Sequence, residues 1–223
     1  MNMGFGYAVP AGELGWLTLT IGHLSANKYW GEAERRRGPL CTSTLIKCPE
    51  GLVLVDPPVP PAEVPRLLIE QAGIAASDVD VVFLTHFHGD HRFGLEAFPG
   101  ADWLMAEPEI DFARAAAGPE EAELLARIRP AGAEVVPGLR VLHTPGHTPG
   151  LSSIVFAWRD RRVAVCGDAV MTEDHFRARE GHHNSTDFAQ ASASIELIAR
   201  EADVVVPGHG AAFDIAWTRE GGR

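Results

Sequence analysis

Short β-rich runs that end in polar loops dominate this sequence of 223 residues. Residues 16–21 alternate bulky and threonine positions, and the β-rich runs 43–47 and 52–55 flank a turn at Pro49-Glu50-Gly51. We expect these three runs to form an antiparallel meander. Further strands are predicted at residues 80–84, 103–106, 153–158, 162–166 and 203–206, and a hairpin at 134–136 and 140–142.

Four segments have the apolar spacing of amphipathic helices, namely residues 62–72, 108–117, 120–128 and 187–200. The first stops at Gly73, and Ser185, Thr186 or Asp187 can cap the last. The polar stretches 85–91 and 172–184 lack either periodicity and are predicted to be loops. Because strands prevail and no linker interrupts the chain, we expect two packed sheets with helices outside, in a single domain of residues 1–223.

Composition limits the class of protein and its partners. With 46% hydrophobic residues the chain can bury a core, and a net charge of -11 disfavours binding to nucleic acid. The basic clusters at residues 35–37 and 159–162 are interpreted as solvated turns. No apolar run reaches the ~18 residues of a membrane span. Three cysteines without a CxxC pair, and no Lys or Arg in the first 27 residues, favour a cytoplasmic protein without a secretory signal.

The placement of the histidines is the strongest functional signal. Ten histidines are present, and five of them lie in loops that follow predicted strands: His86, His88, His91, His147 and His209. Imidazole and carboxylate groups are the usual ligands of zinc and related divalent ions, and a strand end can aim them. His86 and His88 can point to the same side of an extended segment, while Asp90 and His91 lie beyond Gly89. This spacing predicts ligands for two adjacent ions.

The segment Thr85-His86-Phe87-His88-Gly89-Asp90-His91 resembles the signature of the metallo-β-lactamase superfamily. The later parts of that pattern follow in order, at His147 in Thr144-Pro145-Gly146-His147-Thr148, at Asp168 in Cys166-Gly167-Asp168 and at His209 in Pro207-Gly208-His209-Gly210. The resemblance extends from about Leu17 to Phe213. It implies an α/β, or α+β, fold, a four-layer αββα sandwich with the metal site at the edge between the two sheets.

The resemblance also implies the role of each matched residue. One metal is held by His86, His88 and His147, a second by Asp90, His91 and His209, and Asp168 bridges them. The family's early-strand aspartate is matched by Asp56, although Pro57-Pro58 replaces the usual small residues after it. Asp90, Asp56 and a metal-bridging water are the expected catalytic groups.

Two divalent cations are the expected cofactors. Zinc is the first expectation, and iron and manganese stay open as alternatives because no cysteine is among the matched ligands. Two cations about 3.5 to 4 Å apart lower the pKa of a shared water and polarise the oxygen of the substrate. The site is therefore expected to generate a hydroxide nucleophile at neutral pH.

The fold and the metals do not select the substrate. The leading hypothesis is a hydrolase of a small ester, thioester or lactone, because the net charge disfavours a polyanion. The alternatives are a phosphodiesterase or ribonuclease, a mononuclear iron enzyme resembling the persulfide dioxygenases, and a non-catalytic metal-bound binding module. The short tail after His209 disfavours a glyoxalase II, and the acidic Asp168 disfavours a true β-lactamase. The oligomeric state stays open.

Several other residues are open to a functional interpretation. His175, His182, His183 and Asn184 lie in the predicted loop 172–184, where a solvated position is expected and contact with substrate is the alternative. His23 and His143 are predicted to be structural. For most of the early aromatic residues we expect core packing, with a pocket or a subunit contact as the alternative. These are Phe5, Tyr7, Trp16, Tyr29 and Trp30.

Overall fold

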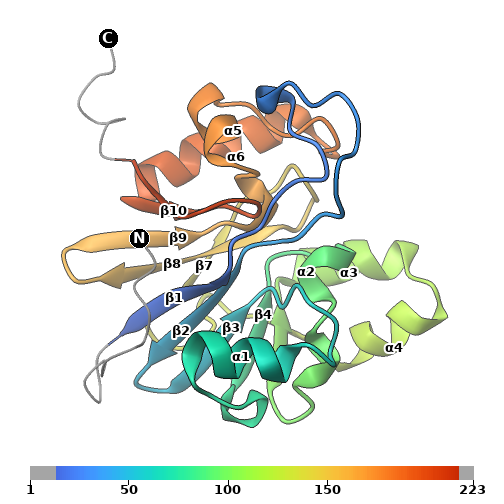
Figure 1. The fold of residues 1–223 in the computed structure, drawn as a ribbon, viewed down its shortest axis with the longest axis vertical. Coiled ribbons are helices and arrows are strands. Elements are labelled where there is room, and N and C mark those ends of the chain that lie inside the picture. Colours follow the sequence, from blue (N-terminus) through green and yellow to red (C-terminus); the bar gives the residue numbers. More distant parts are fainter. Residues whose placement is uncertain (1–13, 216–223) are drawn as a thin grey trace.

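The computed structural model describes residues 14–215, which form two stacked sheets (Figure 1). The first sheet has six strands in chain order: β1 (Gly15–Thr20), β2 (Ser43–Cys48), β3 (Gly51–Val55), β4 (Val81–Leu84), β5 (Asp102–Met105) and β6 (Arg129–Pro130). The second has five, in the order β11 (Phe213–Asp214), β10 (Val204–Val206), β9 (Arg161–Val165), β8 (Ser152–Trp158) and β7 (Arg140–His143).

The direction of the strands changes within each sheet. Strands β1, β2 and β3 pair antiparallel, which confirms the predicted meander and its turn. Strands β3 to β6 then pair in parallel. In the second sheet β7, β8 and β9 are antiparallel, and β10 pairs with β9 in parallel. Parallel neighbours direct their carboxyl ends to the same edge of a sheet, and that edge carries the functional loops.

Alternation of apolar side chains explains the four layers. On β3, Val53 and Val55 face the second sheet and join a core that also contains Val163 of β9. Leu54 points the other way and packs with Leu68 of helix α1 (Val64–Ala72). Both faces of the central strands are therefore buried, which requires helices on the outside.

Helices cover the outer face of each sheet (Figure 1). Against the first sheet pack α1, α3 (Glu107–Ala116) and α4 (Pro119–Arg127), and against the second α5 (Glu173–Ala178) and α6 (Phe188–Glu201). Short helical turns complete the chain: η1 (Lys28–Trp30), η2 (Ala76–Asp78), α2 (Gly89–Arg92), η3 (Leu95–Ala97) and η4 (Gly167–Ala169). The αββα sandwich predicted from the resemblance is confirmed.

The predicted elements need three corrections. Helix α5 lies within the predicted loop 172–184, and α2 overlaps the predicted loop 85–91; they are six and four residues long, too short to show a helical period. Residues 134–136 form only an isolated bridge from Glu134 to Arg140, and β7 pairs with β8 instead. The two-residue strands β6 and β11 were not predicted.

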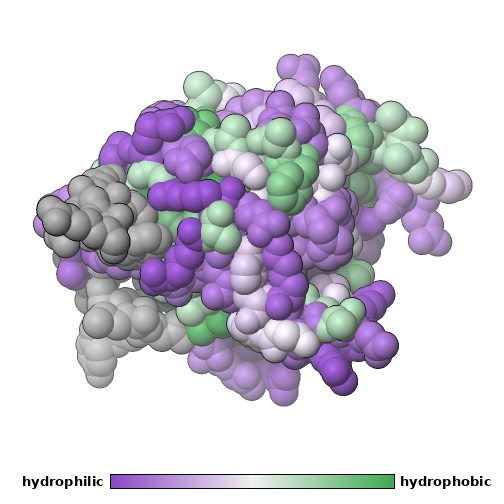
Figure 2. All heavy atoms as spheres, turned by 90° about the horizontal axis from the view of Figure 1, so that it is seen from above, coloured by the Kyte–Doolittle hydropathy of each residue, from purple (hydrophilic) through white to green (hydrophobic). Residues whose placement is uncertain are grey.

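The surface on the side of α5 and α6 is seen from above in Figure 2. Hydrophilic residues cover much of this face, and smaller groups of hydrophobic residues lie between them (Figure 2). Within residues 14–215, none of the helices is long and apolar enough to cross a membrane.

Candidate metal centre

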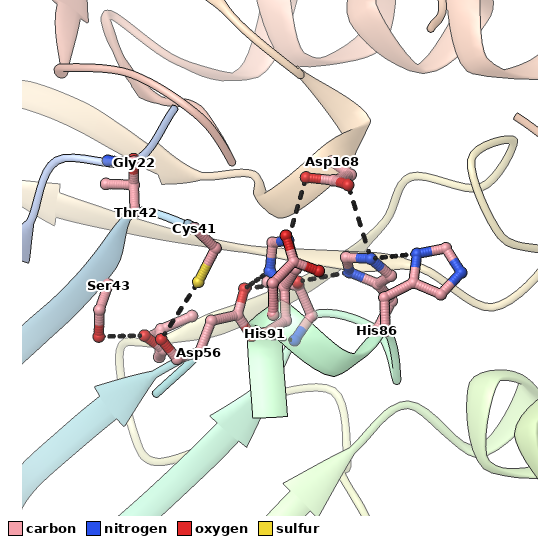
Figure 3. Close-up of polar contacts among 12 residues, drawn as sticks. Gly22, Cys41, Thr42, Ser43, Asp56, His86, His91 and Asp168 are labelled. Atoms are coloured by element: carbon pink, nitrogen blue, oxygen red, sulfur yellow. Dashed lines mark hydrogen bonds and ion pairs between the residues drawn. The ribbon is translucent and has the colours of Figure 1, made fainter. Parts of the chain in front are cut away.

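The predicted ligand residues follow the ends of strands in both sheets. His86 and His88 follow β4 of the first sheet, whereas His147 lies between β7 and β8 of the second. Asp168 follows β9, and His209 follows β10. Figure 3 shows His86, His91 and Asp168 converging where the ends of the two sheets meet. The structure thus brings together side chains that are far apart in the sequence.

One group of ligand atoms comprises His86, His88, His147 and Asp168, and all four atoms lie within 4.8 Å of one another. Nδ1 of His88 lies 3.0 Å from Nε2 of His86 and 3.0 Å from Nε2 of His147. His86 and His147 are buried, whereas His88 is exposed. Three converging imidazoles and a carboxylate form a donor set that suits zinc. We call this the first group.

The second group comprises Asp90, His91 and His209, whose ligand atoms also lie within 4.8 Å of one another. Asp90 and His91 are carried by α2, the helical turn directly after the first pair of histidines. Nε2 of His209 lies 3.6 Å from Oδ2 of Asp90. Both imidazoles are buried, and Asp90 is partly exposed, so solvent reaches this group through the aspartate.

Asp168 faces both groups. Its Oδ2 lies 3.2 Å from Nε2 of His147 and 3.7 Å from Nε2 of His86. Its Oδ1 lies 3.2 Å from Nε2 of His91 and 3.3 Å from Nε2 of His209. Because each oxygen faces the imidazoles of a different group, a single carboxylate is placed to contact two cations.

Close packing fixes the position of Asp168. A Cβ on Gly208 would lie 2.2 Å from Oδ1 of Asp168, so only glycine fits there. Gly167 has a φ of +47°, and a Cβ there would lie 2.2 Å from Oγ1 of Thr85. The glycines of two sequence motifs therefore allow the carboxylate and its neighbouring loops to approach one another.

Unsatisfied polar atoms in the cluster indicate that a cation fits there. Nε2 of His91 and Oδ1 of Asp168 are buried and have no hydrogen-bond partner among the described residues. Buried polar atoms without partners are costly, and these two point into a set of nitrogen and oxygen donors. A bound divalent ion would satisfy them.

The electrostatic environment differs between the two groups. Burial lowers the pKa of His86 and His147, the latter to about 4, so both imidazoles are neutral at pH 7. Burial also opposes a charge on His91, but the carboxylates of Asp168 and Asp56 outweigh it and raise the pKa of this histidine well above its usual value. Metal binding therefore has to displace a proton from the second group but not from these two histidines.

Asp56 holds His91 from behind the site (Figure 3). Its Oδ2 lies 2.8 Å from Nδ1 of His91 and accepts the hydroxyl hydrogen bond of Thr85 at 2.7 Å, and its Oδ1 accepts the Thr85 N–H at 2.8 Å. The Asp56 side chain is 1% exposed, so it cannot contact a substrate. Its place is that of a residue that orients a ligand.

His209 is also fixed on the side away from the cluster. Its Nδ1 lies 2.8 Å from the carbonyl oxygen of Leu40. The hydroxyl of Thr42 donates to the carbonyl of Gly210 at 2.8 Å, and the N–H of Thr42 donates to the carbonyl of Gly208. The loop that carries His209 is thereby tied to the chain just before β2.

The family model for the metallo-beta-lactamase superfamily matches residues 36–209, which is most of the chain and contains every residue of both groups. This protein belongs to the metallo-β-lactamase superfamily. The family membership predicted from the sequence is confirmed, and the chain is a metallo-hydrolase of this superfamily.

Individual members of the superfamily are also similar to this chain in sequence or structure. An N-acyl homoserine lactonase from Bacillus sp is 26% identical over 91% of this chain and 92% of its own length. The human metallo-beta-lactamase domain-containing protein 1 is 34% identical over 78% of this chain and 63% of its own length. The solved structure of AidC, a dizinc quorum-quenching lactonase in complex with a product, aligns with a TM-score of 0.71 at 20% identity, covering 90% of this chain and 89% of that chain.

Three histidines outside the two groups gather in this metallo-β-lactamase domain. The rings of His175 and His182 lie 5.4 Å apart, and those of His182 and His183 lie 4.1 Å apart. His183 and Asn184 are exposed, as predicted, and the Asn184 side chain contacts His182. His175 departs from the prediction: it lies on α5, is 1% exposed and bonds Oγ1 of Thr172 at 2.8 Å.

The remaining predictions concern histidines and aromatic residues that belong to neither ligand group. His23 contacts the carbonyl of Gly38, and His143 lies on β7; neither joins a ligand group. Trp16 packs against Phe156 in the core, as predicted. Tyr29 and Trp30 are instead 38% and 59% exposed, because the turn that carries them lies over α5 and not between the sheets. Phe5 and Tyr7 lie outside the described residues.

The basic cluster at residues 159–162 lies away from the site, and arginines of both basic clusters are paired with carboxylates. Residues 159–162 form the turn between β8 and β9, at the opposite end of β9 from Asp168. Arg161 pairs with Asp214, and Arg162 with Asp203 at 3.9 Å. Arg37 pairs with Glu32. Carboxylates therefore neutralise these arginines.

Proposed function

We propose that this protein hydrolyses a lactone, or a closely related ester or thioester, with two divalent cations held by the first and second groups. The observation that carries the proposal is the position of Asp168, whose two oxygens each face the imidazoles of a different group. His86, His88 and His147 would hold one ion and Asp90, His91 and His209 the other. Zinc is the proposed metal, since the donors are imidazole and carboxylate and AidC is a dizinc enzyme.

Two bound cations would lower the pKa of a water between them and polarise the carbonyl oxygen of the ester. The side chains of this chain supply the rest of the chemistry. Asp56 holds Nδ1 of His91, which presents Nε2 to the site. The Asp90 side chain is 17% exposed and can accept a proton from the attacking water at Oδ2. It would return this proton to the ring oxygen that leaves, so that one water is consumed and an acid and an alcohol are formed.

Support for a lactone as substrate comes from the relatives. Several curated relatives are N-acyl homoserine lactonases that match over 91% of this chain at 24 to 26% identity. The neutralised arginines on the far side of β9 weigh against a phosphodiester or RNA substrate. An N-acyl homoserine lactone is therefore the first compound to test.

The test compares ring opening of N-hexanoyl homoserine lactone, followed by proton release, with hydrolysis of a nitrophenyl ester, a thioester and bis-nitrophenyl phosphate. Each is measured with the protein as purified, after chelation, and after return of Zn2+. We expect lactone turnover that chelation abolishes, that two Zn2+ per chain restore, and that His88→Ala removes. His143→Ala is the matched control, since His143 is an exposed histidine outside both groups.

Two results would overturn the proposal. One bound iron per chain together with oxygen consumption would favour a dioxygenase. Faster turnover of the phosphodiester than of every carboxylic ester would favour a nuclease.

A further inference from the structure

Glu109 is a buried carboxylate that no sequence motif marks. It lies in the first turn of α3, is 1% exposed, and belongs to neither ligand group. Its Oε1 accepts the N–H of Phe87 at 3.2 Å. Its Oε2 accepts the hydroxyl of Thr148 at 2.7 Å and the N–H of Gly150 at 3.1 Å. Three donors from two distant loops thus converge on one carboxylate.

These two loops carry every imidazole of the first group. Phe87 lies between His86 and His88, and Thr148 follows His147 directly. The first loop leaves β4 of one sheet, and the second joins β7 and β8 of the other. Glu109 therefore fixes the spacing between two parts of the chain that approach from opposite sheets.

Close backbone packing accompanies these hydrogen bonds. A Cβ on Gly150 would lie 2.0 Å from the backbone nitrogen of Glu109. A Cβ on Gly146 would lie 2.1 Å from the backbone nitrogen of Ala191 on α6. The loop that carries His147 thus rests directly on the backbones of α3 and α6, and only glycine permits this approach.

His147 needs this support because its own ring is not held from behind. Nδ1 of His147 is buried and has no hydrogen-bond partner among residues 14–215. In the second group, by contrast, Nδ1 of His91 lies against Asp56 and Nδ1 of His209 against a backbone carbonyl. A ligand ring without such a partner takes its orientation from its backbone, and Glu109 holds that backbone on the C-terminal side of His147.

A buried carboxylate is costly to desolvate, and burial raises the pKa of Glu109 although its three hydrogen bonds oppose that shift. Each donor that points at it is an N–H or O–H, so a carboxylate matches all three. Glutamine would present only one acceptor oxygen. If that oxygen stayed with Thr148 and Gly150, the amide NH2 would face the N–H of Phe87, donor against donor.

We propose that Glu109 is the positioning residue of the first metal group, and that it sets the metal affinity of this group by fixing the two loops that carry its histidines. The proposal rests on the ligand assignment of the proposed function. It predicts a loss confined to one of the two groups, whereas a general structural role would weaken both.

The experiment measures Zn2+ affinity for each group separately, by competition with a chromophoric chelator. His209→Ala disables the second group and reports on the first, and His88→Ala does the reverse. In the His209→Ala background, we expect Glu109→Gln to weaken Zn2+ binding about 10- to 100-fold. In the His88→Ala background, Glu109→Gln should leave the affinity unchanged within error. Glu109→Ala should cost more than Glu109→Gln in the first background, since glutamine keeps one acceptor.

Two variants serve as controls. Glu107→Gln removes an exposed carboxylate from the same turn of α3 and should leave both affinities unchanged. Thr148→Val removes one of the three donors without changing the shape of the side chain, and should weaken the first group by less than Glu109→Ala. It also keeps the test valid if the Glu109 variants do not fold, which far-ultraviolet circular dichroism of the metal-free chains would reveal. The visible spectrum of Co2+ bound in the His209→Ala background should change with Glu109→Gln.

If Glu109→Gln lowered the Zn2+ affinity equally in both backgrounds, or in neither, the proposed positioning role of Glu109 would be wrong. The native chain tests the proposed function independently, because it must bind two Zn2+ and open a lactone whatever Glu109 does. A chain that does both but loses affinity equally in the two backgrounds would refute only the positioning role.

Discussion

The two ligand groups are held in place by different means. In the second group, Asp56 and the carbonyl of Leu40 contact the imidazoles of His91 and His209 directly. In the first group, Glu109 contacts no imidazole and bonds the loops that carry the histidines. Where each imidazole has its own hydrogen-bond partner, the metal affinity of the group should change when that single partner is substituted. Where the loops are held instead, the metal affinity of the group should change when a substitution alters the packing of those loops.

Asp168→Ala removes the carboxylate that faces both ligand groups. It should have the largest effect on metal content and turnover. We expect Zn2+ to fall from two per chain to fewer than one, and turnover to fall by about 10³-fold, because metal-ion catalysis contributes several kcal/mol. Elemental analysis after dialysis and initial rates check both outcomes. Asp160→Ala, in the turn at the far end of β9, is the control. If Asp168→Ala kept both ions, the idea of a shared carboxylate would be wrong.

Asp56→Asn should act directly on His91 of the second group, and only through Thr85 on His86 of the first group. Asparagine keeps one acceptor oxygen, so its NH2 must face either His91 and the Thr85 hydroxyl, which Oδ2 now contacts, or the Thr85 N–H, which Oδ1 now accepts. We expect the second group to lose about 10- to 100-fold in Zn2+ affinity, measured in the His88→Ala background. The same substitution in the His209→Ala background should cost less. A larger loss of Zn2+ affinity in the His209→Ala background than in the His88→Ala background would contradict the assignment of Asp56 to the second group and Glu109 to the first.

The pH dependence of metal binding should separate the two groups further. Burial keeps the pKa of His86 and His147 below its usual value, so these rings are already deprotonated above pH 6.5. The raised pKa of His91 means that Zn2+ must displace a proton below that pKa. Between pH 6.5 and 8 the affinity of the first group should therefore change little. That of the second should rise with pH, by up to about tenfold per unit for each proton displaced.

Competition titrations at several pH values, in the His209→Ala and His88→Ala backgrounds, check this difference. A first group as pH-dependent as the second would show that its histidines are protonated in the metal-free chain, and would remove the electrostatic contrast.

Charge reversal away from both groups should have the smallest effect. Arg161→Glu with Arg162→Glu changes the turn at the opposite end of β9 from Asp168. Lactone turnover and both metal affinities should stay within about twofold, since exposed ion pairs contribute little. The measurement is the ratio of kcat/KM values. A large loss on any substrate would place that substrate against the β8–β9 turn and would reopen the nuclease hypothesis.

Most of the strands and the residues that gather in the two groups could be predicted, the strands from local signals and His147, Asp168 and His209 from the resemblance to the superfamily. Apolar runs with turn residues between them mark the strands, and His86 to His91 form a dense motif at the end of β4. Short elements have no such signal, which is why α2 and α5 were assigned to loops. The exposure of Trp30 was also missed, because it depends on where its turn lies and not on hydropathy.

Glu109 shows that sequence motifs identify the candidate ligands but not the residues that position them. In the sequence it is one of two glutamates around a proline at the start of an amphipathic helix, a pattern that favours helix initiation and nothing more. Its role depends on donors 22 and 41 residues away along the chain. Such a contact has no periodicity or motif, so it becomes visible only in three dimensions.

The ligands come from both sheets, and this has a consequence for folding as well as for chemistry. A pair of ions joined to side chains between residues 86 and 209 would act as a cross-link across the sandwich. The native state alone offers this complete set, so each ion would add about 2.7 kcal/mol to the free energy of unfolding at a free concentration 100 times its dissociation constant. The lifetime of this protein against proteolysis should then depend on the free concentration of the metal that it binds, so metal starvation would lower the amount of the protein as well as its activity.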